Sequence, residues 1–177
     1  GAFGFSAGGF TVLTLAGGKP RMSAISEHCR RSPEFICQAL AQLKSSLLDD
    51  GNNAGTFVKD ERLKAAVLAA PGLGFAFDAE SLSDVRIPIQ TWSGDRDETV
   101  PSATNTDQIA KGLGTLAETH SIPNASHFSF LQPCGLIRPE PFCTDPEGFD
   151  RVAAHKAMNA EVVEFFDSHM PPSSQRN

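Results

Sequence analysis

The chain has 177 residues, of which 15 are basic and 21 acidic, so its formal net charge is −6 at pH 7. Hydrophobic residues make up 40% and charged residues 20%, which is typical of one folded globular domain rather than of a disordered chain or a coiled coil. The acidic balance argues against a nucleic-acid partner, because affinity for phosphates requires clustered Lys and Arg. No apolar run approaches the roughly 18 residues that a membrane span needs, so the sequence predicts none.

Short apolar runs alternate with helical segments along the chain. Apolar runs that end at Gly or Pro are typical of buried strands, whereas apolar residues at helical spacing predict helices. The alternation predicts an α/β fold in which helices cover both faces of a mostly parallel sheet. The predicted strands are residues 2–5, 64–70, 87–92 and 115–122, and the predicted helices are residues 7–16, 22–48 with an interruption at Pro33, 102–113 and 146–170.

The last predicted helix is amphipathic and closes the domain. Residues 49–55 (DDGNNAG) are typical of a surface loop, and residues 171–177 (PPSSQRN) of a frayed tail. We therefore expect one domain over residues 1–170 and a disordered tail over residues 171–177. The inner face of the last helix is expected to contain Val152, His155, Met158, Val162 and Phe166.

Four cysteines form two closely spaced pairs, Cys29 with Cys37 and Cys134 with Cys143. Neither pair has the C-x-x-C spacing of a zinc ribbon or a thioredoxin-like site, so we predict no metal site. An even number of cysteines in proline-containing segments favours two local disulfides and an oxidising compartment. Four unpaired thiols in a cytosolic protein are the alternative.

Residues 4–8 (GFSAG) match the pattern G-x-S-x-G, the nucleophile elbow. In that motif a serine lies on a strained turn between a strand and a helix, and the flanking glycines allow close backbone approach. The predicted strand ends at Phe5 and the predicted helix begins at Ala7, so the required context is present. The alternative is a glycine-rich turn in which Ser6 merely caps the helix.

An acidic loop and a histidine loop follow two later strands. Asp97 comes after the strand over residues 87–92, and His127 comes after the strand over residues 115–122. The order Ser6, Asp97, His127 is that of an α/β-hydrolase triad, and each residue follows a parallel strand at the edge where such sheets bind ligands. Asp95 is the alternative acid.

The chemistry gives each residue a role. Ser6 would attack the acyl carbon, and His127 would take its proton and then protonate the leaving group. Asp97 would hold the imidazole tautomer and stabilise the imidazolium. The backbone N–H of Ala7 would be one donor of the oxyanion hole.

Other histidines and several phenylalanines have less specific interpretations. His120 and His155 are expected to pack in or near the core, and His28 and His169 have no predicted role in the chemistry. Phe5, Phe75 and Phe128 could line an acyl-binding wall, although core packing is the alternative for each.

The sequence resembles the α/β-hydrolase superfamily and, within it, the predicted dienelactone hydrolases related to platelet-activating-factor acetylhydrolases. The resemblance covers residues 1 to about 170. It implies hydrolysis of a small-molecule carboxylic ester through an acyl-enzyme without a cofactor, and an exported protein, periplasmic or secreted. Serine in place of the cysteine of true dienelactone hydrolases favours a carboxylesterase or phospholipase-type substrate. The segments that carry the resemblance are GFSAGGFTVL (4–13), IPIQTWSGDRDETVP (87–101), ASHFSFLQPC (125–134) and PEGFDRVAAHKAMNAEVVEFF (146–166).

Members of that family have several strands and a second oxyanion donor before the elbow. The chain therefore resembles the C-terminal portion of such a domain, and we expect an upstream segment of the same protein to complete the fold and the activity. Without it, the strand over residues 2–5 would expose an edge of the sheet. Two alternative functions remain open at this point: a serine peptidase of the prolyl-oligopeptidase type, and a non-catalytic α/β-hydrolase remnant.

Overall fold

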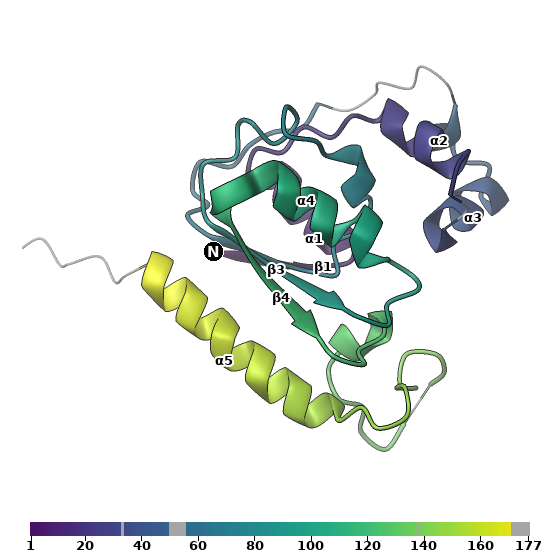
Figure 1. Cartoon of the computed structure of the whole chain (residues 1–177), viewed down its shortest axis with the longest axis vertical. Helices are drawn as coiled ribbons and strands as arrows, with labels where there is room; N and C mark the ends of the chain where they lie inside the picture. Colours follow the sequence, from purple (N-terminus) through teal and green to yellow (C-terminus); the bar gives the residue numbers. More distant parts are fainter. Residues whose placement is uncertain (33, 50–55, 138, 171–177) are drawn as a thin grey trace, which may run out of the picture.

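The computed structural model of the chain describes residues 1–32, 34–49, 56–137 and 139–170. Four parallel strands form one sheet in the order β1 (Ala2–Phe5), β2 (Ala66–Ala69), β3 (Ile89–Gly94) and β4 (Ala117–Ile122) (Figure 1). The predicted parallel sheet is confirmed, with strand limits that differ by a few residues. β2 is buried along its whole length because it lies between two strands and under helices on both faces.

Helices cover both faces of this sheet, as the alternation of elements predicts. α1 (Ala7–Leu15) and α4 (Thr106–Leu113) lie on one face, and α5 (Arg151–His169) crosses the other (Figure 1). Alternate residues of β2 point to opposite faces, so Leu68 packs with α1 and α4 while Val67 packs with α5.

The last helix begins later than the sequence predicts. Its first residue is Arg151, because the side chain of Asp150 caps the helix by accepting a hydrogen bond from the Ala153 N–H at 3.0 Å. The predicted start at Pro146 is therefore wrong. The side chain of Val152, which the sequence places on the inner face of this helix, is exposed to solvent. The buried residues of α5 are Arg151, Met158 and Phe165.

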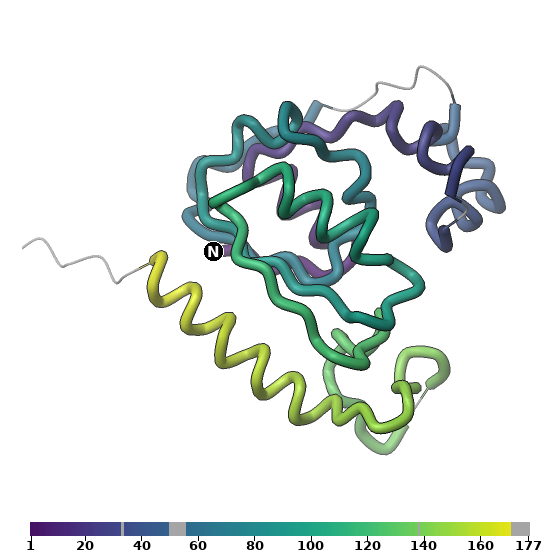
Figure 2. Tube along the Cα trace, viewed as in Figure 1, coloured from purple at the N-terminus to yellow at the C-terminus, as the bar shows by residue number. Residues whose placement is uncertain are grey.

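The predicted helix over residues 22–48 is two helices and a short turn. The chain leaves the sheet after α1 to form α2 (Ser23–Cys29) and α3 (Phe35–Gln42), which lie together at one end of the molecule (Figures 1 and 2). Ile25 and Leu40 form a small core there with Ala76. The predicted interruption at Pro33, most of the predicted loop over residues 49–55, and the predicted tail over residues 171–177 lie outside the described residues.

Both cysteine pairs form disulfides. Cys29 is joined to Cys37, which links α2 to the start of α3, and Cys134 is joined to Cys143 in the loop before α5. The alternative of four unpaired thiols is wrong. Two disulfides are consistent with an oxidising compartment. Among the residues that the structure describes, no helix is long and apolar enough to cross a membrane.

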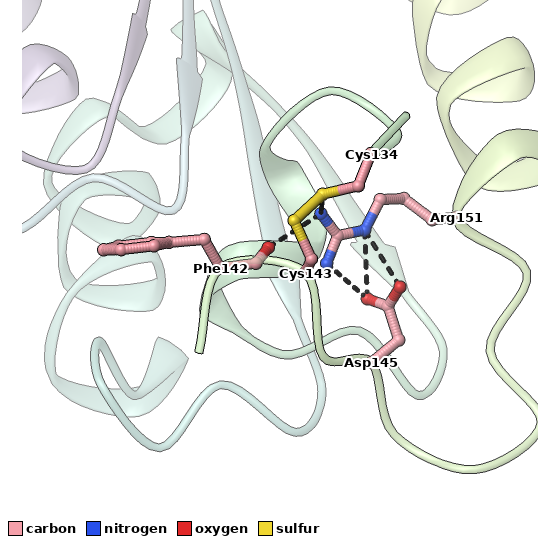
Figure 3. Close-up of a disulfide and its surroundings, with 5 residues drawn as sticks. All are labelled: Cys134, Phe142, Cys143, Asp145 and Arg151. Atoms are coloured by element: carbon pink, nitrogen blue, oxygen red, sulfur yellow. Dashed lines mark hydrogen bonds and ion pairs between the residues drawn. A yellow bond between two sulfur atoms is a disulfide. The ribbon is translucent and has the colours of Figure 1, made fainter. Parts of the chain in front are cut away.

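The loop closed by Cys134 and Cys143 is fixed by the buried side chain of Arg151 (Figure 3). The guanidinium group forms two-pronged hydrogen bonds with the carboxylate of Asp145 and donates another to the carbonyl oxygen of Phe142 at 2.9 Å. The start of α5 is thereby tied to this loop.

β1 is an edge strand. Within the described part of the chain it pairs with β2 alone, and the side chain of Phe3 is 47% exposed. An unpaired edge of this kind presents free backbone N–H and C=O groups to another strand.

Candidate active site

The residues proposed for the triad lie together at one edge of the sheet. Ser6 follows β1, Asp97 follows β3, and His127 begins a short 3-10 helix, η5 (His127–Phe130), after β4. Because all four strands are parallel, the loops at their carboxyl ends meet at the same edge. The turn after β2 reaches the same edge. Gly72 lies in this turn, and its N–H donates a hydrogen bond to the Ser6 carbonyl oxygen.

Hydrogen bonds join the three side chains in series. The Nε2 atom of His127 lies 2.9 Å from the Oγ of Ser6, and its Nδ1 lies 2.7 Å from Oδ2 of Asp97. His127 and Asp97 are both buried, so this pair is shielded from water. If Nδ1 carries the proton that Asp97 accepts, Nε2 is left free to accept the proton of the Ser6 hydroxyl.

The turn that carries Ser6 is strained and closely packed. Ser6 has φ 53° and ψ −119°, a left-handed conformation that a non-glycine residue rarely adopts. A Cβ at Gly4 would lie 2.2 Å from the carbonyl oxygen of Gly8, so only glycine fits at position 4. Gly8 itself has open space around its Cβ position, whereas one at Gly9 would lie 2.9 Å from Pro71.

The side chain of Ser6 is not used to cap α1. Ser6 occupies the N-cap position, but its hydroxyl makes no capping hydrogen bond and is engaged with His127 instead. The interpretation of Ser6 as a simple capping serine is therefore wrong.

Asp97 and the alternative acid, Asp95, have different hydrogen-bond partners. Oδ1 of Asp97 accepts hydrogen bonds from the N–H groups of Thr99 and Val100, at 3.0 and 2.7 Å, which leaves Oδ2 for His127. Asp95 is exposed, and its carboxylate accepts from the N–H of Asn124. Asp97 thus faces the imidazole, and Asp95 stabilises the turn after β4.

Polar contacts from several elements position the turn that carries His127. The hydroxyl of Ser129 accepts from the N–H of Ser126 and donates to Asp145 at 2.9 Å. The ring of His155 contacts the carbonyl oxygen of Ser129 at 2.9 Å, so α5 also supports the turn. Because Asp145 is paired with Arg151, the disulfide-closed loop in Figure 3 is connected to η5.

A cavity of about 250 Å³ opens beside Ser6 and His127. Phe128 lines it, as the sequence predicts, but Phe5 and Phe75 do not. Phe5 packs against the ring of His127, with centroids 4.8 Å apart, and Phe75 stacks on His28 at 3.8 Å. The cavity is lined by Ser6, Ala7, Phe10, Glu34, Phe35, Ile36, Gly72, Leu73, Thr99, Val100, Asn105, His127 and Phe128.

Ala7 also lines the cavity, as an oxyanion donor must. It is the first residue of α1, and the amide groups of the first helical turn have no acceptor within the helix. The N–H of Ala7 is therefore suited to receive negative charge that develops beside Ser6.

His120, His169 and Glu118 make their contacts outside the triad. His120 stacks on Trp92, with ring centroids 4.3 Å apart, and contacts Glu118, and His169 contacts the Phe165 carbonyl oxygen. Hydrogen bonds from Gln90 and His120 lower the pKa of Glu118. Within the described residues no three His, Cys, Asp or Glu side chains gather as the ligands of a metal ion would.

Sequence reasoning missed most of the cavity wall. Leu73 could have been found, because it follows β2 just as the triad residues follow their own strands. Phe10, Glu34, Phe35, Ile36 and Asn105 carry no local signal, since only the packing of α1, α3 and α4 brings them to this edge.

Comparisons with known proteins identify no family. No protein-family model and no curated protein matches the chain. Among solved structures, the chain is similar to an acetyl ester-xyloside bifunctional hydrolase from Caldicellulosiruptor lactoaceticus, with 20% sequence identity and a TM-score of 0.39. The similarity covers 72% of this chain and 47% of that one, so the chain spans about half the length of the protein it matches.

Proposed function

We propose that this protein is a serine hydrolase that cleaves carboxylic esters through an acyl-enzyme intermediate. The observation that supports it most is the series of hydrogen bonds from the Ser6 hydroxyl through His127 to Asp97, beside an apolar cavity. A serine hydroxyl is a weak nucleophile until an adjacent base removes its proton. The engagement of Ser6 with His127, rather than with the helix, supports this reaction over a purely structural role.

In the proposed reaction, Ser6 Oγ attacks the ester carbonyl carbon while Nε2 of His127 takes the hydroxyl proton. Negative charge on the carbonyl oxygen is stabilised by the Ala7 N–H, and the imidazolium is stabilised by Asp97. The C–O bond to the alcohol breaks as His127 returns the proton to the leaving oxygen. Water, activated by His127 in the same way, then cleaves the acyl-Ser6 ester and releases the acid.

The cavity wall supports the proposed substrate class. Apolar side chains from α1, α3 and the loops after β2 and β3 surround Ser6, which suits an apolar acyl or alcohol group. Oxygen esters are the substrates we favour; amide hydrolysis, as in the peptidase alternative, has no specific structural support here.

Two further proposals complete this view. The unpaired edge of β1 is where we expect an upstream segment of the same protein to add a strand and the second oxyanion donor. The two disulfides suit a periplasmic or secreted protein.

The proposed function is tested by hydrolysis of p-nitrophenyl esters, with matched peptide anilides in parallel. We expect ester turnover that falls by at least about 10³-fold in Ser6→Ala, because the attack step needs the hydroxyl. Ester hydrolysis that persists in Ser6→Ala would contradict the proposal, and preferential cleavage of the anilides would support the peptidase. A folded protein that includes the expected upstream segment and cleaves neither substrate would support the non-catalytic alternative.

A further inference from the structure

The cavity beside Ser6 is lined by an acidic side chain that takes no part in the proposed mechanism. Glu34 precedes α3 and lines the cavity together with the neighbouring Phe35 and Ile36. Its side chain is 11% exposed. Burying a carboxylate in largely apolar surroundings is unfavourable unless hydrogen bonds compensate for the lost water.

One oxygen of the Glu34 carboxylate has two polar partners. Oε1 of Glu34 contacts Nε2 of His28 at 2.9 Å and accepts a hydrogen bond from the Thr104 hydroxyl at 2.7 Å. These partners are themselves held in place. The ring of His28 stacks on Phe75 with an angle of 7° between the planes, and Thr104 Oγ1 receives a hydrogen bond from Asn105 at 3.1 Å. The orientation of the carboxylate is therefore fixed from two sides.

The other oxygen is buried and unpaired. Among the residues that the structure describes, Oε2 of Glu34 has no hydrogen-bond partner, and it is out of contact with solvent in this conformation. A donor from a bound molecule therefore reaches it only when neighbouring side chains of the cavity wall move. Leaving such an acceptor unsatisfied is unfavourable, because its bonds to water are lost and not replaced. A purely structural link to His28 and Thr104 needs only one of the two oxygens. An orphaned acceptor on a residue that lines the cavity is what a site for a hydrogen-bond donor requires.

Three other polar side chains of the cavity, those of Ser6, His127 and Asn105, already have hydrogen-bond partners. Ser6 and His127 are bonded to each other. The side chain of Asn105 accepts from the Gly74 N–H and donates to the Pro101 carbonyl oxygen, so its acceptor and its donor both have partners. Among these side chains of the cavity wall, Glu34 alone has an acceptor without a described partner, its Oε2 atom.

We propose that Glu34 determines specificity by accepting, through Oε2, a hydrogen bond from a hydroxyl or ammonium group of the ester, remote from the carbonyl that Ser6 attacks. The inference rests on the proposed function, because it takes the cavity to be the substrate site. A substrate with such a donor satisfies the orphaned oxygen, whereas an analogue with a methyl group leaves it buried and unpaired. The donor-bearing ester should therefore be preferred by about 10- to 100-fold in kcat/KM.

The test compares matched p-nitrophenyl esters whose acyl chains end in a hydroxyl, an ammonium or a methyl group, over several chain lengths. A second series varies the alcohol in the same way, with acetate as the acyl group. We expect one donor-bearing ester to exceed its methyl analogue by at least about tenfold in kcat/KM. Preference for the hydroxyl compound identifies a neutral donor, and preference for the ammonium compound identifies a cation.

The variant Glu34→Gln keeps the size of the side chain and can still accept from Thr104, but it presents an amide N–H₂ in place of Oε2. We expect the preference for the donor-bearing ester to fall below about twofold, because the amide N–H₂ cannot accept its hydrogen bond. Glu27→Gln is the matched control, because Glu27 is exposed and paired with Arg21, and it should keep the wild-type preference.

Three outcomes would overturn the inference. Equal rates for all wild-type substrates would do so even if the variant did not fold. A Glu34→Gln variant that keeps the preference, or that slows every ester by the same factor with a lower melting temperature, would assign Glu34 a structural role only. In these cases ester hydrolysis by Ser6 would stand, whereas absence of any Ser6-dependent hydrolysis would refute the proposed function itself.

Discussion

The Gly94 Cα and the backbone of Ala125 are in such close contact that a Cβ at Gly94 would lie 2.4 Å from the carbonyl oxygen of Ala125. The same carbonyl accepts a hydrogen bond from the Arg96 N–H at 3.0 Å. These contacts join the loop that carries Asp97 to the loop that carries His127. The separation of these two loops sets the distance between the carboxylate of Asp97 and the imidazole of His127.

We therefore predict that Gly94→Ala pushes the two loops apart. The variant should lose about 1–3 kcal/mol of unfolding free energy, because the backbone has no room for the methyl group. Ester hydrolysis should fall by at least about tenfold, because a small misplacement of catalytic groups is costly. Denaturant unfolding and kcat/KM measure both effects. Gly135→Ala, where a Cβ meets nothing within 4 Å, is the control; equal behaviour of the two variants would contradict the prediction.

The two carboxylates of the acid loop should differ sharply in their effect on activity. In Asp97→Asn the amide N–H₂ would face Nδ1 of His127, which forces the proton onto Nε2 and removes the base from Ser6. We expect kcat to fall by about 10³- to 10⁴-fold. Asp95→Asn should keep kcat within about threefold, since Asp95 contacts only the turn at Asn124 in this network. A greater loss in Asp95→Asn would reverse the assignment.

The glycines of the elbow should not be equivalent. Gly4→Ala would force a methyl group against the Gly8 carbonyl and should destabilise the fold by at least about 2 kcal/mol. Gly8→Ala places a methyl group in open space on a helix, where alanine is favoured by about 0.5–1 kcal/mol. Thermal and denaturant unfolding of both variants provide the comparison. A stable Gly4→Ala variant would show that the elbow does not need glycine there.

The candidate site also shows what the sequence can and cannot predict. The G-x-S-x-G pattern predicts Ser6 as the nucleophile, and the acidic and histidine loops after two later strands predict Asp97 and His127 as its partners. Because the strands are parallel, their ends bring the three side chains within hydrogen-bond distance. The limits of α5 were misjudged because the cap at Asp150, not the apolar pattern, determines where the helix begins. Glu34 was missed because it reaches the cavity only through the packing of α2 and α3. Local patterns thus predict the strand ends, whereas the cavity wall depends on tertiary contacts.

The ion pair between Asp145 and Arg151 should matter for both stability and activity. Arg151 is only 6% exposed, so Asp145→Ala would leave its guanidinium group buried and unpaired. Breaking a buried pair in this way costs about 3–5 kcal/mol. Because Asp145 also accepts from Ser129, the turn carrying His127 should loosen and kcat should fall.

The matched control for Asp145→Ala is Asp84→Ala, which removes an exposed pair with Lys19 and should cost at most about 1 kcal/mol. Denaturant unfolding at neutral pH measures both variants. If Asp145→Ala were no more destabilising than Asp84→Ala, the proposed support of η5 by the disulfide-closed loop would be contradicted.

The most direct test of the proposed mechanism is covalent labelling of the folded protein by a fluorophosphonate, followed by intact mass measurement and peptide mapping. We predict one adduct per chain, located on Ser6, absent in Ser6→Ala and formed much more slowly in Asp97→Asn. If the folded protein, with the expected upstream segment present, takes up no adduct or is labelled at a residue other than Ser6, the assignment of Ser6, His127 and Asp97 as a catalytic triad is contradicted.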